Sequence, residues 1–175
     1  MATGSRIAGL LLCGLLGFFG LIPLEVARAT PLGPPRDAPI LTISGKIKVT
    51  NLNGIAAFDR GMLEALGTVS IETKTPWHRD TVKFEGVTLN KLLERVGATG
   101  SLITAVALND YSVEIPVSDF EKFGTILALK RDGEYMPVRD KGPLFIVYPY
   151  DAYPELKSQI YYGRSAWQVA KLIVH

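Results

Sequence analysis

The segment ILALKRDGEYM, residues 126–136, decides the fold class because it predicts two short strands joined by a tight turn. Residues 126–130 and 134–136 flank the dipeptide Asp132-Gly133. Both positions of such a dipeptide tolerate the positive φ angles that a two-residue hairpin turn requires. A β-hairpin is therefore expected here, and the sheet that contains it must be built from short elements.

Short strands and short helices alternate on both sides of this hairpin. Further strands are expected at residues 40–43, 46–49, 68–73, 82–84, 102–108, 144–148 and 167–174, with residues 102–108 the most apolar and therefore central. Helices are expected at residues 59–66, capped by Asp59 and stopped by Gly67, at residues 89–96, capped by Thr88 and ended by Gly97, and as one turn at residues 119–123. Segments this short and mixed predict a compact α+β domain with a mixed sheet rather than a regular doubly wound sheet.

The first 29 residues have the pattern of a cleavable secretion signal. Arg6 precedes an apolar run over residues 7–24, and the small-residue pattern Ala27-Arg28-Ala29 follows, so cleavage is expected before Thr30. An uncleaved membrane anchor is the alternative, because the run has the minimum length of a spanning helix. Lipid attachment at Cys13 is less favoured, since its neighbour Leu12 is not small.

The signal contains no twin arginine, which favours a Sec-type route that carries an unfolded chain to the periplasm or the medium. Residues 30–39 contain four prolines and are expected to form a stiff linker, so the folded domain spans residues 40–175. Cys13 is the only cysteine, so the exported chain has no disulfide. Its near-neutral charge and scattered basic residues exclude nucleic acid and, after cleavage, an anionic membrane as expected partners.

Most catalytic motifs are absent from the sequence. It has no phosphate-binding glycine loop, no nucleophile elbow and no paired histidines at metal-ligand spacing. A nucleophile-histidine-carboxylate triad would have to use His78, and a solvated loop histidine beside Arg79 and Asp80 is the favoured interpretation. The catalytic residues, if any, are therefore not identified by the sequence.

A set of motifs in a shared order is more informative. The series comprises Thr73 with Trp77, Phe84, Gly86-Val87, Leu89, Leu92-Leu93, Asn109-Asp110-Tyr111, Ile115-Pro116, Gly142-Pro143-Leu144, Pro149 and Trp167. Over residues 40–174 this series resembles the oxidoreductase molybdopterin-binding domain family, which has the sulfite oxidase-like fold. The resemblance implies a compact mixed α and β domain that holds molybdenum through a pterin dithiolene and one protein thiolate.

Three features depart from the pattern of that family. The position that matches the ligating cysteine is Thr73, whose hard hydroxyl oxygen cannot replace a soft thiolate. The position after the Gly-Pro-Leu motif, where many members have an arginine near the anionic site, is Phe145. The signal also lacks the twin arginine that exported members usually carry. The fold is therefore expected without the metal, so that no cofactor is expected and molybdopterin remains the alternative.

The candidate binding residues come from three segments. The loop at the position of the family's cofactor contains Thr73, Lys74, Thr75, Trp77, His78 and Arg79. Residues 148–162 contain five of the seven tyrosines, among them Tyr148 and Tyr150, which suit ligand recognition or simply complete the core. Asn109, Asp110 and Tyr111 are typical of a turn after a buried strand, and they could also line a cleft.

Three functional hypotheses follow. The first is an exported, metal-free binding module that recognises a small anionic or aromatic ligand or a periplasmic protein through these residues. The alternative is a periplasmic molybdopterin-dependent oxidoreductase in which protein sulfur does not ligate the metal. The third is a structural partner subunit.

Overall fold

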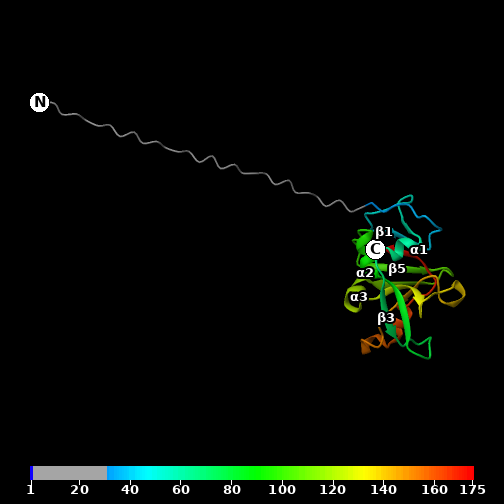
Figure 1. Cartoon of the computed structure of the whole chain (residues 1–175). Helices are drawn as coiled ribbons and strands as arrows, with labels where there is room; N and C mark the ends of the chain where they lie inside the picture. The colour runs from blue at the N-terminus through cyan, green and yellow to red at the C-terminus, as the bar shows by residue number, and fades with distance from the viewer. Residues whose placement is uncertain (2–30) are drawn as a thin grey trace.

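The computed structural model describes Met1 and residues 31–175 (Figure 1). The signal expected at residues 1–29 therefore lies outside the described residues, apart from Met1. In its described part the chain folds into an α+β structure with one mixed sheet, one antiparallel sheet and four short α-helices. None of these helices has the length and hydrophobicity of a transmembrane span.

The first sheet has the strand order β2-β1-β10-β5-β6. Its strands are β1 (Leu41–Gly45), β2 (Ala56–Phe58), β5 (Leu102–Ala107), β6 (Ser112–Pro116) and β10 (Val169–Val174). β1 and β10 are parallel, and the other neighbours in this sheet are antiparallel. The sheet is therefore mixed, and its middle strand is β10. The strand expected to be central, β5, lies inside this sheet, one place from the middle, and pairs with β10 on one side and β6 on the other.

The second sheet is antiparallel and contains the predicted hairpin. Its strands are β3 (Val69–Thr73), β4 (Val82–Thr88), β7 (Ile126–Arg131), β8 (Glu134–Tyr135) and β9 (Phe145–Val147). They follow the order β3-β4-β7-β8, and β9 also pairs with β7. Asp132 and Gly133 connect β7 to β8 with φ angles of 51° and 85°, as the turn requires.

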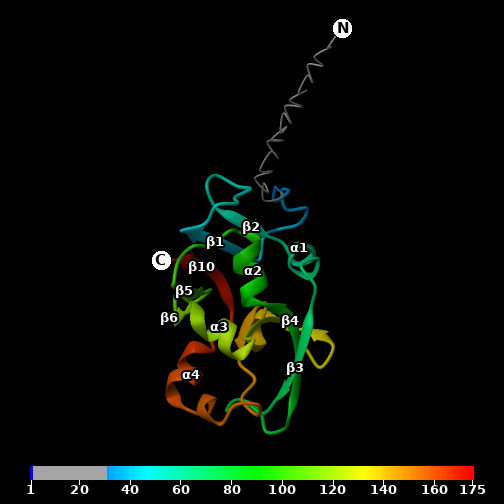
Figure 2. The same cartoon turned by 90° about the vertical axis from the view of Figure 1, so that its left-hand side faces the viewer.

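Four α-helices and two 3₁₀ turns connect the strands. They are α1 (Arg60–Glu64), α2 (Leu89–Arg95), α3 (Val117–Phe123), α4 (Gln159–Arg164), η1 (Val138–Asp140) and η2 (Pro154–Leu156). Asp59 caps α1 by accepting a hydrogen bond from the Met62 N–H at 2.7 Å, and Thr88 caps α2. In Figure 2, α2 and α3 lie between the strands of the first sheet and the strands β3 and β4. The larger of two hydrophobic clusters therefore contains side chains of both helices and of both sheets, and the smaller cluster belongs mainly to the second sheet.

One expected strand does not form. Residues 46–49 alternate in character, but they turn away from β1 after Gly45. The N–H groups of Lys48 and Val49 instead donate to the carbonyl of Val96, at the end of α2. The place beside β1 is taken by β10 and β2, so the prediction of a strand at 46–49 was wrong.

The proline-rich segment has no helix or strand over residues 31–39. It is attached to the domain by several hydrogen bonds: the N–H groups of Arg36 and Asp37 donate to Oδ2 of Asp59, and Nδ2 of Asn51 donates to the carbonyl of Gly33 at 2.7 Å. The carboxylate that caps α1 thus also holds this segment against the domain.

Candidate functional site

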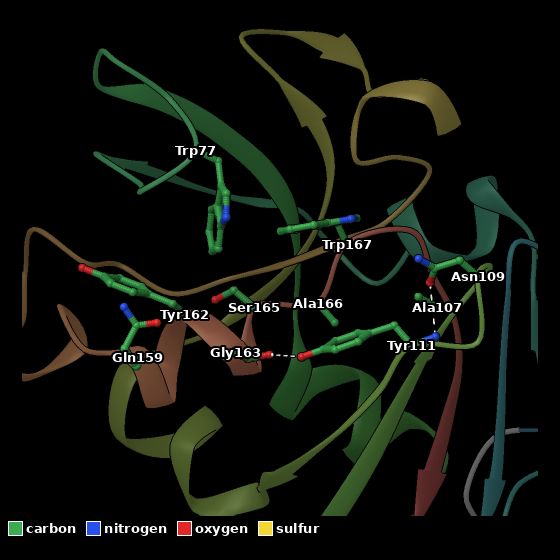
Figure 3. A pocket seen from close by; sticks show the side chains of 10 residues that line it. All are labelled: Trp77, Ala107, Asn109, Tyr111, Gln159, Tyr162, Gly163, Ser165, Ala166 and Trp167. Atoms are coloured by element: carbon green, nitrogen blue, oxygen red, sulfur yellow. Dashed lines mark hydrogen bonds between the residues drawn. The ribbon is translucent and has the colours of Figure 1, made fainter.

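An aromatic pocket with a volume of about 380 Å³ lies between β5, β6, α4 and the start of β10 (Figure 3). This is within the usual range for small-ligand sites, at its lower end. The aromatic walls come from four separate segments, and the floor is made of small residues. The lining residues are Trp77, Ala107, Asn109, Tyr111, Gln159, Tyr162, Gly163, Ser165, Ala166 and Trp167.

Trp77 forms the wall contributed by the loop between β3 and β4. Its half-buried indole packs against both hydrophobic clusters of the domain. The ring makes edge contacts with Phe145 at 5.6 Å, Trp167 at 5.5 Å and Tyr162 at 6.2 Å between centroids. Such edge-to-face contacts stabilise the ring beyond its burial. Trp77 is therefore held in place by the core while it lines the pocket.

Tyr111 and Trp167 lie on opposite sides of the pocket in Figure 3. Trp167 is 36% exposed and Tyr111 is 48% exposed. The Tyr111 hydroxyl donates to the carbonyl of Gly163 at 3.0 Å, which fixes the ring against α4. These two rings are accessible from solvent, so a ligand can reach the space between them.

The segment Asn109-Asp110-Tyr111 combines both roles considered from the sequence. Asp110 has a φ angle of 63°, and Oδ1 of Asn109 accepts the N–H of Tyr111 at 3.2 Å, as in a turn stabilised by an asparagine side chain. Asn109 and Tyr111 also line the pocket, whereas Asp110 does not. The turn therefore directs its two outer residues into the cavity.

Thr73 is fully buried and lines neither the aromatic pocket nor its smaller neighbour. Its hydroxyl accepts the N–H of Asp151 at 3.1 Å and donates to the carbonyl of Lys74 at 3.3 Å. In return, Oδ2 of Asp151 accepts the N–H of Lys74 at 2.8 Å. These bonds lock the loop after β3 to the turn after β9. The hydroxyl of Thr73 is thus committed to internal hydrogen bonds.

His78 is half-buried, which corrects the interpretation as a solvated loop histidine. Its Nδ1 lies 2.7 Å from Oγ1 of Thr75, and its Nε2 lies 3.4 Å from a guanidinium nitrogen of Arg131. The ring also packs edge-on against Phe84. Burial, together with the positive charges of Lys141 and Arg131, holds the pKa of His78 below its ordinary value of 6.5. The neutral imidazole is therefore the favoured form near neutral pH.

Tyr148 and Tyr150 belong to the core rather than to the walls of the aromatic pocket. The Tyr148 hydroxyl donates to Oδ2 of Asp119 at 3.0 Å, and Arg164 donates to the same oxygen at 2.8 Å. Ser165 donates to the carbonyl of Tyr161, so its single proton is used and the hydrogen bond between Ser165 and Tyr150 takes its proton from Tyr150. Burial raises the pKa of Tyr148, and it raises the pKa of Tyr150 to about 12.

The remaining candidates lie outside the aromatic pocket. Lys74 and Thr75 line a smaller hollow of about 270 Å³ with Tyr150 and Tyr162, on the other side of the Trp77 loop. Arg79 is exposed at the end of that loop. The loop therefore divides its residues between two cavities, and Tyr162 is shared by both.

A third hollow is larger, at about 880 Å³, but it is formed by the proline-rich segment lying over α1. Its buried acid, Asp59, already accepts hydrogen bonds from Arg36, Asp37 and Met62. These hydrogen bonds hold the pKa of Asp59 below its ordinary value, and the bond from the N–H of Met62 has the largest effect. Because the carboxylate of Asp59 is already engaged in these hydrogen bonds, we consider this hollow a weaker candidate for ligand binding than the aromatic pocket.

The sequence predicted three of the pocket residues as candidates, Trp77, Asn109 and Tyr111, and none of the small residues of the floor. Trp167 belongs to the ordered series of motifs and Tyr162 to the tyrosine-rich segment, and neither was predicted as a site residue. Alanine and glycine carry no chemical signal, so the small residues of the floor could not be found by composition. The residues outside the candidate set are Ala107, Gln159, Tyr162, Gly163, Ser165, Ala166 and Trp167.

The pocket walls carry no carboxylate, ammonium, guanidinium or imidazole group. The nearest cation with a defined contact is Lys141, whose Nζ lies 5.8 Å from the ring centroid of Trp167. Within residues 31–175, no group of three or more His, Cys, Asp or Glu side chains is arranged to hold a metal ion. The geometry thus offers aromatic surface and hydrogen bonds rather than acid–base groups.

No protein-family model matches this sequence, and no curated protein matches it either.

Proposed function

We propose that the protein is an exported binding module that holds a small ligand in the aromatic pocket between Trp77, Tyr111 and Trp167. The observation that carries this proposal is the pocket itself. It has the volume of a small-molecule site, aromatic walls and accessible rings, and Trp77 and Tyr162 pack against the hydrophobic core. The secretion signal at residues 1–29 is the basis for placing the module in the periplasm or outside the cell.

We further propose that the fold is of the sulfite oxidase molybdopterin-binding type. The ordered series of motifs from Thr73 to Trp167 supports this type, and the mixed α+β architecture is compatible with it. The pocket adjoins the loop from Thr73 to Trp77, which corresponds to the place where the resemblance puts the cofactor. The binding site would then have kept its position while its chemistry changed.

A molybdenum atom held by a protein thiolate does not fit the residues at this place. Thr73 presents an oxygen instead of sulfur, and that oxygen is buried and engaged with Asp151 and Lys74. Phe145 is fully buried beneath Trp77 and Trp167, where an arginine would bring a positive charge toward an anionic cofactor. Both positions contribute apolar packing or internal hydrogen bonds in place of ligand contacts. We therefore derive no reaction through such a cofactor.

The test has a metal arm and a binding arm. Wild type and Thr73→Cys are expressed with their own signal in a host that makes the cofactor, and molybdenum is measured by elemental analysis. We expect the molybdenum content of both proteins to be far below one atom per chain. A single cysteine at residue 73 supplies neither the positive charge that is missing at Phe145 nor the space for a metal ion. Stoichiometric molybdenum in the wild type would instead support the alternative, a periplasmic molybdopterin-dependent oxidoreductase.

The binding arm uses a variant that fills the pocket without disturbing the core. A Cβ at Gly163 would meet no atom within 4 Å, so Gly163→Leu is expected to fold and to occupy the cavity. Gly33→Leu is the matched control, since its Cβ is equally unobstructed and Gly33 lies beside the proline-rich hollow instead. Small molecules that raise the Tm of wild type and Gly33→Leu, but not of Gly163→Leu, would establish the site. A ligand set that never distinguishes the two variants would contradict it.

A further inference from the structure

We infer that the group inserted into the aromatic pocket is an uncharged, flat ring system that carries a hydrogen-bond acceptor. This inference rests on the proposed function, and it narrows the ligand class for the same pocket. It is carried by the positions of Trp167 and Tyr111, by the absence of charged groups from the lining, and by the hydrogen bonds that the polar side chains already make.

The shape of the site favours a flat group. Trp167 and Tyr111 lie across the pocket from each other, and Trp77 and Tyr162 close a third side (Figure 3). The contacts of Trp77 with Trp167 and Tyr162 are edge contacts, at interplanar angles of 80° and 75°. A planar ring can therefore stack on one wall while its edge meets another, which are the two arrangements that aromatic pairs prefer.

The lining excludes an anionic group from the inserted part. A charged group that loses its water needs an opposite charge or several directed hydrogen bonds, and the ten lining residues supply no cation. The ammonium of Lys141 lies over the ring of Trp167, 5.8 Å from the ring centroid, and it is also within 3.8 Å of Oδ1 of Asp140. An anion could therefore be tolerated on a part of the ligand that remains in solvent, and not inside the pocket.

A cationic group is excluded by a different feature. Aromatic walls attract cations in many proteins, so a quaternary ammonium is the main competing ligand class. Here the lining contains no carboxylate, and the side of the pocket formed by Trp167 carries the ammonium of Lys141. Arg131, which contacts His78, does not line the pocket, and its guanidinium is paired with Asp140 at 2.7 Å. A cation that enters the pocket would therefore lose water without gaining a carboxylate, and it would meet a Trp167 ring that already contacts the ammonium of Lys141.

The polar groups indicate an acceptor on the ring. The hydroxyls of Tyr111 and Ser165 already donate to the carbonyls of Gly163 and Tyr161. Oδ1 of Asn109 accepts the N–H of Tyr111, so the amide nitrogen of Asn109 can donate to a ligand, as can the amide of Gln159 and the indole N–H groups of Trp77 and Trp167. A carbonyl oxygen or a ring nitrogen on the ligand would accept one of these protons.

Three probes with the same bicyclic ring and different charge test the inference: acetylnaphthalene, naphthoate and naphthylmethyl-trimethylammonium. Binding to the full exported protein is measured by isothermal titration calorimetry and by ligand-observed NMR. We expect acetylnaphthalene to bind at least about tenfold more tightly than either ion, because each ion would lose water without gaining a partner. Plain naphthalene should bind several-fold more weakly than acetylnaphthalene, and Asn109→Leu should reduce that difference while binding of naphthalene persists.

The outcomes separate the ligand class from the proposed function. Preference for the neutral probe, lost in Gly163→Leu and retained in Gly33→Leu, would support the inference. Equal or tighter binding of either ion, with the same dependence on Gly163→Leu, would overturn the ligand class and leave the pocket established as a binding site. Failure of all four compounds to bind in a way that Gly163→Leu alters would overturn both, since the pocket would then accept no ring of this size.

Discussion

Replacing Thr73 by Val should destabilise the protein by about 1 to 3 kcal/mol, although the two side chains have nearly the same shape. The hydroxyl of Thr73 is fully buried and accepts the N–H of Asp151 at 3.1 Å. Valine leaves that N–H without its partner, and a part-buried unpaired donor costs more than the net value of the bond it loses. The second bond of this connection, from the N–H of Lys74 to Asp151, should persist, because neither of its atoms is altered.

The measurement is urea denaturation followed by circular dichroism, together with hydrogen exchange of the Asp151 amide by NMR. We expect faster exchange at Asp151 in Thr73→Val and protected exchange in Thr73→Ser, which keeps the hydroxyl. Thr68→Val is the control, because Thr68 is exposed and its replacement should change the free energy of unfolding by less than about 0.5 kcal/mol. A Thr73→Val protein as stable as the wild type, with unchanged exchange at Asp151, would refute the structural role assigned to this hydroxyl.

Three further predictions concern the core, the backbone and pH. Leu92→Ala and Leu144→Ala should each lower the free energy of unfolding by about 2 to 5 kcal/mol in urea denaturation, because both leucines are fully buried. Leu102→Ala should lower it clearly less, because Leu102 is only half-buried. Equal losses in the three variants would show that the packing is misassigned. Gly86→Ala should lower the Tm strongly, since its Cβ would overlap the carbonyl of Leu127 in the neighbouring strand, whereas Gly163→Ala should not lower it. The folded-state pKa of His78 lies below the unfolded value of 6.5, so its contribution to stability is complete above pH 6.5 and is lost as the pH falls through the folded-state pKa. The decrease in Tm between about pH 7.5 and about pH 5 should therefore be smaller in His78→Gln, and an unchanged decrease would exclude His78 as its source.

The local elements could be predicted where one or two residues determine the backbone. Asp132-Gly133 fixes a hairpin, and Asp59 and Thr88 begin helices, because these side chains act on neighbouring N–H groups or tolerate unusual φ angles. Residues 46–49 have the composition of a strand, yet the N–H groups of Lys48 and Val49 donate to the carbonyl of Val96 at the end of α2. Such competition between distant partners cannot be detected from local composition.

The pocket could be predicted only in part, for a similar reason. The sequence predicts Trp77, Asn109 and Tyr111 because aromatic and turn-forming side chains have recognisable structural preferences. The floor was not found, because Ala107, Gly163 and Ala166 contribute by being small where three distant segments meet. Tyr148 and Tyr150 have the composition of a binding surface, but their hydroxyls are satisfied inside the core by Asp119 and Ser165.

The position of β10 has a consequence for how the chain reaches its native state. β10 is the last strand along the chain, and it separates β1 from β5 in the middle of the first sheet. Until residues 169–174 are available, the sheet consists of two unconnected pairs with open edges, β2 with β1 and β5 with β6. Pairings between segments this far apart are slow to form, and open edges invite association with other chains. A nascent chain therefore cannot complete this sheet before residues 169–174 have been synthesised, which makes it dependent on protection from aggregation until then.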